Sequence, residues 1–269
     1  MKYDPIKNIF GNIVRKRPIL RISFYKLLGI MFLREWHVKR ELRRILGSSG
    51  NRSLIYDAGS GFGQYSYYMA NHFPGARIYA VDVKEDQIAD CTSFFKAVGL
   101  DRCSFAVEDL THIGHENRFD FILSVDVMEH IPDDVGVFRN FHRALKSNGV
   151  LFINTPSNLG GSDVHSPEDK SFIEEHARNG YGADEIREKL ESVGFVVEKV
   201  KYTYGTWGTL AWRLGIKYPM LMLNASKAFF LVLPFYYLGT FPFALIFMYL
   251  DYTANNRAGT GLNVVARKS

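Results

Sequence analysis

Cysteine is scarce in this chain of 269 residues, with Cys91 and Cys103 as its only two. Two cysteines cannot form the disulfide framework of a small secreted domain, so a reducing, cytosolic compartment is expected. We also expect no cleaved leader, because Arg21 and Lys26 interrupt the first apolar run and no small-residue cleavage site follows it. Internal repeats and low-complexity tracts are missing as well, and the length suits one large α/β domain or at most two small ones.

Acidic residues are scarce in the first fifty positions. That stretch holds twelve Lys/Arg and three Asp/Glu, a net charge of +9, so the rest of the chain carries −4. Such a basic arm suggests an anionic partner, either nucleic acid or an anionic lipid surface. A solvated amphipathic helix is the alternative that the charges alone leave open.

The middle of the chain alternates short β-rich runs with longer polar runs of helical character, which predicts a mainly parallel sheet covered on both faces. Gly149 and Gly194 each follow a predicted helix, where a left-handed cap residue is wanted. The predicted strands are residues 53–57, 77–82, 103–107, 119–125, 150–154, 195–201 and 262–267. The predicted helices are residues 64–73, 84–98, 133–146 and 183–193.

A glycine-rich turn follows the first predicted strand. Gly59, Gly61 and Gly63 let a ligand approach the backbone closely, and the helix after them offers free N–H groups. Gln64 stands where the nicotinamide-binding fingerprint has its third glycine. Asp57 at the strand end would repel a pyrophosphate and attract an ammonium group. The turn therefore favours a ligand with an ammonium group, and an ordinary tight turn is the alternative.

The spacing Asp57-x-Gly59-x-Gly61-x-Gly63 resembles the first motif of class I S-adenosylmethionine-dependent methyltransferases. Five further matching segments follow in order over residues 52–201, several of them at strand ends: Asp82, residues 108–110, residues 119–133, residues 145–151 and residues 176–181. The resemblance implies a doubly wound α/β fold with a mainly parallel, Rossmann-like seven-stranded sheet, and this chain adds an apolar helical insertion before the last strand. It also implies S-adenosyl-L-methionine as the cofactor, bound at the carboxyl ends of the strands.

The resemblance gives individual residues their expected roles. In the family, an acid at the position of Asp82 holds the ribose hydroxyls and an Asp at the position of Asp109 binds the adenine amino group. Asp82 alone would equally suit a dehydrogenase, and Asp109 could instead cap a helix. The residues expected to bind the cofactor are Asp57, Gly59, Ser60, Gly61, Gly63, Gln64, Asp82, Val83, Glu108, Asp109, Leu110 and Val125.

The catalytic group is sought after the fourth strand. His130 follows it near the expected methyl position and could remove a proton from an oxygen acceptor, or it could simply structure the loop. Asp126, Glu129 and His130 would share a face if their segment were helical, and could then hold a divalent cation. The pattern resembles the Glu-x-x-Glu-His of ubiquinone-pathway O-methyltransferases, with Asp126 in place of the first Glu. The same Glu-His is common in the wider group without a metal, so no metal site is expected. His165 and His176 are weaker candidates for acceptor contacts.

The connection between the last two predicted strands, residues 202–260, is far longer than a compact domain needs. Residues 228–250 carry no charge and include nine Phe or Tyr, which is enough length for a membrane span. A single crossing would separate the last strand from its sheet. We therefore expect a re-entrant or interfacial helical hairpin, broken near residues 237–242, with the basic arm beside it on anionic headgroups. A soluble lid or a dimer interface is the alternative.

Four segments are thus predicted: a basic helical arm (1–50), the cofactor-binding core (51–201), an apolar helical insertion (202–260) and the last strand (261–269). The expected function is O-methylation of an apolar or lipid-like small molecule at the cytoplasmic face of a membrane. A nicotinamide oxidoreductase is disfavoured by Asp57 and Gln64. A nucleic-acid methyltransferase is disfavoured because no Asn/Asp-Pro-Pro-Tyr/Phe tetrapeptide follows the fourth strand. A catalytically silent, cofactor-binding membrane adaptor stays open.

Overall fold

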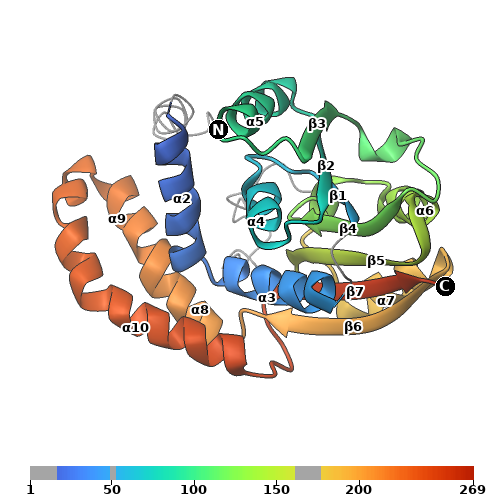
Figure 1. Ribbon diagram of the computed structural model, residues 1–269. Coiled ribbons are helices and arrows are strands. Elements are labelled where there is room, and N and C mark those ends of the chain that lie inside the picture. Colours follow the sequence, from blue (N-terminus) through green and yellow to red (C-terminus); the bar gives the residue numbers. More distant parts are fainter. Residues whose placement is uncertain (1–16, 49–52, 161–176) are drawn as a thin grey trace.

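The protein is built around one twisted seven-stranded sheet (Figure 1). A computed structural model describes residues 17–48, 53–160 and 177–269. The strand order is β3-β2-β1-β4-β5-β7-β6, and β7 runs antiparallel to both of its neighbours while the other pairs are parallel. The predicted fold class is confirmed. The strands are β1 (Leu54–Ala58), β2 (Arg77–Asp82), β3 (Cys103–Val107), β4 (Phe119–Val125), β5 (Leu145–Pro156), β6 (Phe195–Thr203) and β7 (Gly261–Lys268).

Four helices connect the parallel strands in the positions that the sequence predicts. Their bounds are α4 (Gln64–His72), α5 (Glu85–Ala97), α6 (Asp134–Ala144) and α7 (Ala183–Ser192). The expectation for Gly149 is wrong: β5 starts at Leu145 because that residue pairs with Phe119 of β4, and Asn148 rather than Gly149 takes the left-handed conformation, at φ +62°. Gly194 does adopt it, at φ +99°, after α7.

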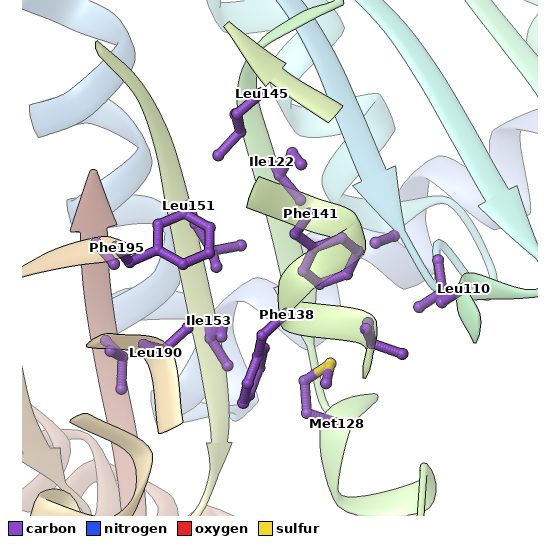
Figure 2. Packing of buried hydrophobic residues seen from close by; sticks show 14 of the residues in the cluster. Leu110, Ile122, Met128, Phe138, Phe141, Leu145, Leu151, Ile153, Leu190 and Phe195 are labelled. Carbon is purple, nitrogen blue, oxygen red and sulfur yellow. The ribbon is translucent and has the colours of Figure 1, made fainter. Parts of the chain in front are cut away.

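Each face of the sheet buries its own apolar core. One core lies under α6 and α7, where Phe138, Phe141 and Leu190 pack against Leu151 and Ile153 of β5 (Figure 2). The other lies under α3 and α4 and collects residues such as Leu42, Met69 and Phe152. Because both faces are covered, the strands between them are almost wholly buried, as near-continuous apolar runs in a parallel sheet require.

Within residues 17–48, the helices α2 (Pro18–Met31) and α3 (Leu33–Ser48) precede the sheet. The inner side of α3 buries Val38, Leu42 and Leu46 against the sheet. Several of its charges point inward as well: Glu41 is 1% exposed and pairs with Arg44 and with Lys199 of β6. Within residues 17–48, several charges of the basic arm are therefore held against the core in ion pairs.

The long connection between β6 and β7 forms a helical hairpin, named here the apolar hairpin (residues 206–253). It runs outward through α8 (Thr206–Trp212), a π-helical segment (Arg213–Lys217) and α9 (Tyr218–Ala225), and returns through α10 (Leu233–Thr253). The expected break near residues 237–242 is wrong, since α10 is continuous through Pro242. The chain turns instead at Ser226, whose extended backbone (φ −160°) and hydroxyl cap the next turn at the amide of Ala228.

A buried carboxylate, Asp251, helps to attach the apolar hairpin to the core. Asp251 near the end of α10 accepts hydrogen bonds from the backbone amides of Tyr204 (3.2 Å), Gly205 (2.7 Å) and Gly208 (3.1 Å). It also meets Nε2 of His37 on α3 at 3.0 Å, and neither side chain is exposed. Arg40 donates to Nδ1 of His37, so the His37 proton lies on Nε2 and is donated to Asp251.

Candidate functional site

The glycine turn between β1 and α4 uses all three of its glycines for backbone shape. Gly59, Gly61 and Gly63 have φ of +80°, +51° and +72°, a region that other residues avoid. A side chain at Gly59 would clash with Val127, and one at Gly63 would lie 3.1 Å from the ring of Phe95. At Gly61 the nearest atom to an added side chain would be Oε1 of Gln87, at 3.9 Å, which is an ordinary contact. The turn is therefore fixed on the protein side and accessible at its centre.

Asp57 lies beneath this turn and is 3% exposed. Its Oδ2 accepts a hydrogen bond from the hydroxyl of Ser66 at 2.5 Å. Burial raises the pKa of Asp57 to about 6, because the charged form loses its hydration. A buried carboxylate with a single hydroxyl partner favours a cationic ligand, since an ammonium group would offset the desolvation of the charge.

Asp82 stands at the carboxyl end of β2, next to the turn. Its Oδ2 accepts from the amide of Gly61 and its Oδ1 from the amide of Lys84, both at 3.0 Å. Each oxygen keeps a second lone pair for a pair of hydroxyl donors. Val83 beside it is 61% exposed and offers an apolar surface. The amides of Gly59 and Ser60 bond the carbonyl of Val81, which ties the turn to this strand.

The acidic pair after β3 splits into two environments. Asp109 is exposed and caps a short 3₁₀ turn by accepting from the amide of Thr111 at 2.9 Å, and the hydrogen bonds from Thr111 lower its pKa. Glu108 turns the other way and accepts from the hydroxyls of Tyr56 (3.0 Å) and Tyr79 (2.5 Å). Asp109 therefore caps the 3₁₀ turn, which agrees with the alternative interpretation of this residue. Its side chain is also exposed to solvent at the carboxyl edge of the sheet. Leu110 behind it is buried.

The segment after β4 is not the helix on which the metal hypothesis depended. Asp126 has φ +52° and pairs with Arg34 of α3, while only Met128–His130 form a 3₁₀ turn. Glu129 is 1% exposed, accepts from Thr155 at 3.1 Å, and burial raises its pKa. His130 is exposed. Within the residues that the structure describes, no three His, Cys, Asp or Glu side chains come together as a metal site.

These side chains lie along one edge of the sheet. Asp57, Asp82, Asp109, Val125 and the residues that follow Val125 stand at or just beyond the carboxyl ends of four adjacent parallel strands. Of the other candidates, Gln64 begins α4 and donates to Glu35 of α3 at 3.1 Å, and the buried hydroxyl of Ser60 has no partner among the described residues. His165 and His176 lie outside the described residues.

A family model described as a methyltransferase domain matches residues 51–203, more than half of the chain. The chain belongs to this methyltransferase family. Its relatives include methyltransferases of several kinds, and a structure solved with S-adenosyl-L-methionine is among its matches, so the predicted enzyme class and cofactor are confirmed. The strand order thus belongs to the fold of this family, whereas the relatives are named for different acceptors.

Three similar proteins show the breadth of the family. Phosphoethanolamine N-methyltransferase 2 of Caenorhabditis elegans is 26% identical over 63% of this chain, which spans only 39% of that relative's length. Demethylmenaquinone methyltransferase of Geobacillus stearothermophilus is 25% identical over 80% of this chain and 98% of its own. Phosphoethanolamine N-methyltransferase 2 of Haemonchus contortus, solved with S-adenosyl-L-methionine, shares the fold with a TM-score of 0.65 and 20% identity, over 96% of this chain and 60% of its own.

Sequence reasoning missed the contacts that the N-terminal helices of this methyltransferase make with the site. Arg21 of α2 is 1% exposed and donates to the carbonyl of Phe62 inside the glycine turn at 2.7 Å. Arg34 of α3 pairs with Asp126, and its backbone amide bonds the hydroxyl of Tyr204 at 2.9 Å. The available signal was an arginine at an otherwise apolar position of a helix, which is typical of a charge with a buried partner.

Proposed function

We propose that this methyltransferase methylates an oxygen atom of an apolar small molecule at a membrane surface. One feature carries the membrane part of the proposal. The outer side of α10 and the turn before it form a continuous apolar stripe, whose large residues are between 36% and 79% exposed. Such a contiguous exposed patch marks an interaction site. The residues of this stripe are Leu231, Val232, Phe235, Leu238, Phe243, Ile246, Tyr249 and Leu250.

Three hydroxyls of the apolar hairpin, those of Tyr236, Tyr237 and Thr240, are bonded to carbonyl groups within it. The hydroxyl of Tyr236 donates to the carbonyl of Leu214 and that of Tyr237 to the carbonyl of Gly215, each at 2.9 Å. Thr240 donates back to the carbonyl of Tyr236. A polar group moved out of water is costly unless it keeps a hydrogen bond. Hydroxyls turned inward beneath an apolar outer side therefore suit an environment with little water.

The length of α10 also fits a membrane environment. Among the described residues it is the one helix long and apolar enough to cross a membrane, with only 11% of its most apolar window buried. Because β6 and β7 flank the apolar hairpin and pair with each other, both of its ends lie on the same side. An interfacial or re-entrant position, rather than a single crossing, agrees with that topology.

The charges of the apolar hairpin favour an anionic lipid surface. No Asp or Glu occurs between residues 206 and 250, while Arg213, Lys217 and Lys227 do. Lys227 stands at the turn between α9 and α10. Basic residues beside an apolar surface attract the anionic headgroups of a cytoplasmic leaflet. We therefore propose that the enzyme acts at the cytoplasmic face of a membrane.

The residues of the edge described above fit the cofactor, and we propose that they hold it. S-adenosylmethionine supplies a methyl group on a cationic sulfonium. Asp57 would face its ammonium group, Asp82 the two ribose hydroxyls and Asp109 the adenine amino group. The glycine turn and Gln64 would line it on one side, and Val83, Leu110 and Val125 on the other. Glu108, held by Tyr56 and Tyr79, would position this strand end rather than touch the cofactor.

We propose His130 as the base. It is exposed and lies just beyond β4, four residues after Asp126, and an imidazole nitrogen can accept the proton of an acceptor hydroxyl. Arg34 and Asp126 close the site on the α3 side. A relative named for demethylmenaquinone supports an apolar acceptor, while the relatives named for phosphoethanolamine favour a second candidate, N-methylation of a small amine.

Vesicle binding and methyl transfer test this function together. The protein is expected to sediment with vesicles that contain phosphatidylglycerol, and Leu238→Asp to weaken that binding about tenfold or more, because a charge replaces a side chain that is 79% exposed on the apolar stripe. Val196→Asp, 56% exposed on β6, is the matched control and should bind as the parent does.

For the activity, S-adenosylmethionine with a radiolabelled methyl group would be offered with a prenylated catechol in the vesicles, or with phosphoethanolamine in solution. We expect label in the lipid phase as a methyl ether. Label on phosphoethanolamine alone would contradict the proposal. Equal vesicle binding by Leu238→Asp and Val196→Asp would contradict it as well.

A further inference from the structure

The inner side of α2 is hydrogen-bonded to the glycine turn. The guanidinium of Arg21 and the hydroxyl of Tyr25 both donate to the carbonyl of Phe62, the residue between Gly61 and Gly63. Arg21 also pairs with Asp90 of α5 at 2.7 Å and lies over the ring of Phe94, 4.4 Å from its centre. A helix outside the parallel sheet thus fixes the backbone of the turn that is proposed to receive the cofactor.

These hydrogen bonds require one particular backbone conformation of the glycine turn. A guanidinium that leaves water loses its hydration, so it stays buried only while its partners are in place. The Phe62 carbonyl faces α2 because the turn bends at Gly61 and Gly63 with positive φ. A ligand that fixes the turn therefore favours docked α2, and docked α2 favours the turn that the ligand needs.

The outer side of α2 has the character of an interfacial helix. Ile19, Leu20, Leu27 and Ile30 are between 39% and 77% exposed, and Lys26 is exposed among them. The helix contains no acidic residue. An exposed apolar surface with flanking basic residues binds in the headgroup region of anionic bilayers. A second copy of the chain would bring like charges together, so the charges favour the bilayer as the occupant.

Residues at the start of α3 contact both α2 and the apolar hairpin. Leu33 follows α2 after one residue and packs against Ala211 of α8 and Met248 of α10. The indole of Trp36 donates to the carbonyl of Gly29 in α2 at 2.8 Å and packs edge-on against Tyr252, 6.0 Å away. Figure 1 shows α2 and the apolar hairpin on the same side of the sheet. A bilayer that binds the apolar hairpin would therefore also lie near α2.

We propose that α2 couples an anionic bilayer to the cofactor site: the bilayer holds α2 in its docked position, and docked α2 holds the glycine turn through Phe62. This inference rests on the membrane contact proposed above. Coupling between two binding events is reciprocal, so vesicles should raise the affinity for cofactor and cofactor should raise the affinity for vesicles by the same factor.

Calorimetric titration with S-adenosylhomocysteine tests the coupling, because this product binds without turnover. With vesicles of phosphatidylcholine and phosphatidylglycerol present, the Kd should fall about tenfold, within the range usual for allosteric coupling. Phosphatidylcholine alone should have a smaller effect. Leu27→Asp on the outer side of α2 should leave the Kd without vesicles unchanged and remove the gain, and Val196→Asp should keep the gain.

A second variant tests the inner side. Tyr25→Phe removes one of the two donors to the Phe62 carbonyl, so it should sediment with vesicles as the parent does and show a smaller gain in affinity. Vesicles that bind the protein without changing the Kd would overturn the coupling and leave the membrane contact intact. A gain that persists in Leu27→Asp would overturn the role of α2. Absence of vesicle binding would overturn the membrane contact and, with it, the coupling.

Discussion

The cofactor-binding core and the apolar hairpin place their charged residues in opposite ways. In the core, charged side chains are brought together at the carboxyl edge of the sheet, and Asp57 is buried there at a cost in hydration. In the apolar hairpin, residues 206–250 contain no acid at all and the outer side of α10 is apolar. The core is thus organised around a polar ligand held inside, and the apolar hairpin around an apolar surface held outside.

The two regions also differ in how they bury apolar surface. Phe138, Phe141 and Phe152 of the core are fully buried, and each such side chain contributes roughly 1.5–3 kcal/mol to stability. Phe235 and Leu238 of the apolar hairpin are 75% and 79% exposed. Sheet packing therefore accounts for the stability of the core, whereas the apolar hairpin depends on its attachment to the core and on whatever covers its outer side.

The attachment point gives the largest expected effect. Asp251→Ala would leave the amides of Tyr204, Gly205 and Gly208 without their acceptor and His37 without its partner, all in a buried position. Loss of one member of such a buried polar network costs about 3–5 kcal/mol. The free energy of unfolding, measured by urea titration followed by circular dichroism, should fall by that amount.

Asp101→Ala is the matched control for this variant. Asp101 is an exposed carboxylate in the turn before β3, so its removal should change the free energy of unfolding by less than about 0.5 kcal/mol. An Asp251→Ala protein as stable as this control would show that the apolar hairpin is not attached through the carboxylate, and the contrast drawn above would lose its structural basis.

The buried acid of the core gives the second prediction. The pKa of Asp57 in the folded protein is about 6, above the value near 3.9 of an unfolded chain. A raised pKa contributes stability below pH 4 that is lost as the pH rises through 6, so the cofactor-free protein should lose about 3 kcal/mol between these values. If the ammonium group of the cofactor binds the ionised form, cofactor affinity changes in the opposite direction.

Calorimetric titration with S-adenosylhomocysteine at pH 5 and at pH 7 measures the change in cofactor affinity. The Kd should be about tenfold larger at pH 5 than at pH 7, because with a pKa near 6 the ionised fraction of Asp57 is about tenfold smaller at the lower pH. Asp57→Asn should bind more weakly at pH 7 and show a flat profile. A flat profile in the unchanged protein would mean that Asp57 is not the group that meets the ammonium.

Much of the core could be predicted from the sequence because its signals are local. Short apolar runs, the glycine turn, and an acid at each strand end follow one another in chain order, so periodicity and motif spacing suffice to place them on one edge. The exception at Leu145 has a non-local cause. The segment after α6 becomes strand early because it pairs with Phe119, which no property of residues 145–149 announces.

The helices outside the sheet were harder to predict, because their roles depend on distant partners. Arg21 looked like an interruption of an apolar run, and only the fold brings Phe62 and Asp90 to it. The turn of the apolar hairpin is expected near residues 237–242, whereas a capping hydroxyl at Ser226 sets it. Pro242 lies on the exposed side of α10, and the helix continues past it.

The smallest expected effect concerns the glycines of the two regions. Gly239 lies inside α10, has an ordinary helical φ, and nothing lies within 4 Å of where a side chain would begin. Gly239→Ala should therefore raise the free energy of unfolding by about 0.5–1 kcal/mol, because alanine loses less conformational entropy in a helix than glycine does. Affinity for S-adenosylhomocysteine should not change.

Gly63→Ala is the counterpart in the core. Gly63 has φ +72°, and an added methyl group would lie 3.1 Å from Phe95, so the same substitution should lower stability and weaken the binding of S-adenosylhomocysteine. Opposite signs for the two substitutions, measured by urea unfolding in buffer without lipid, would show that glycine serves the shape of a binding turn in the core and has no such task in the apolar hairpin. A loss of stability in Gly239→Ala would instead indicate that another part of the protein approaches α10 closely at this position.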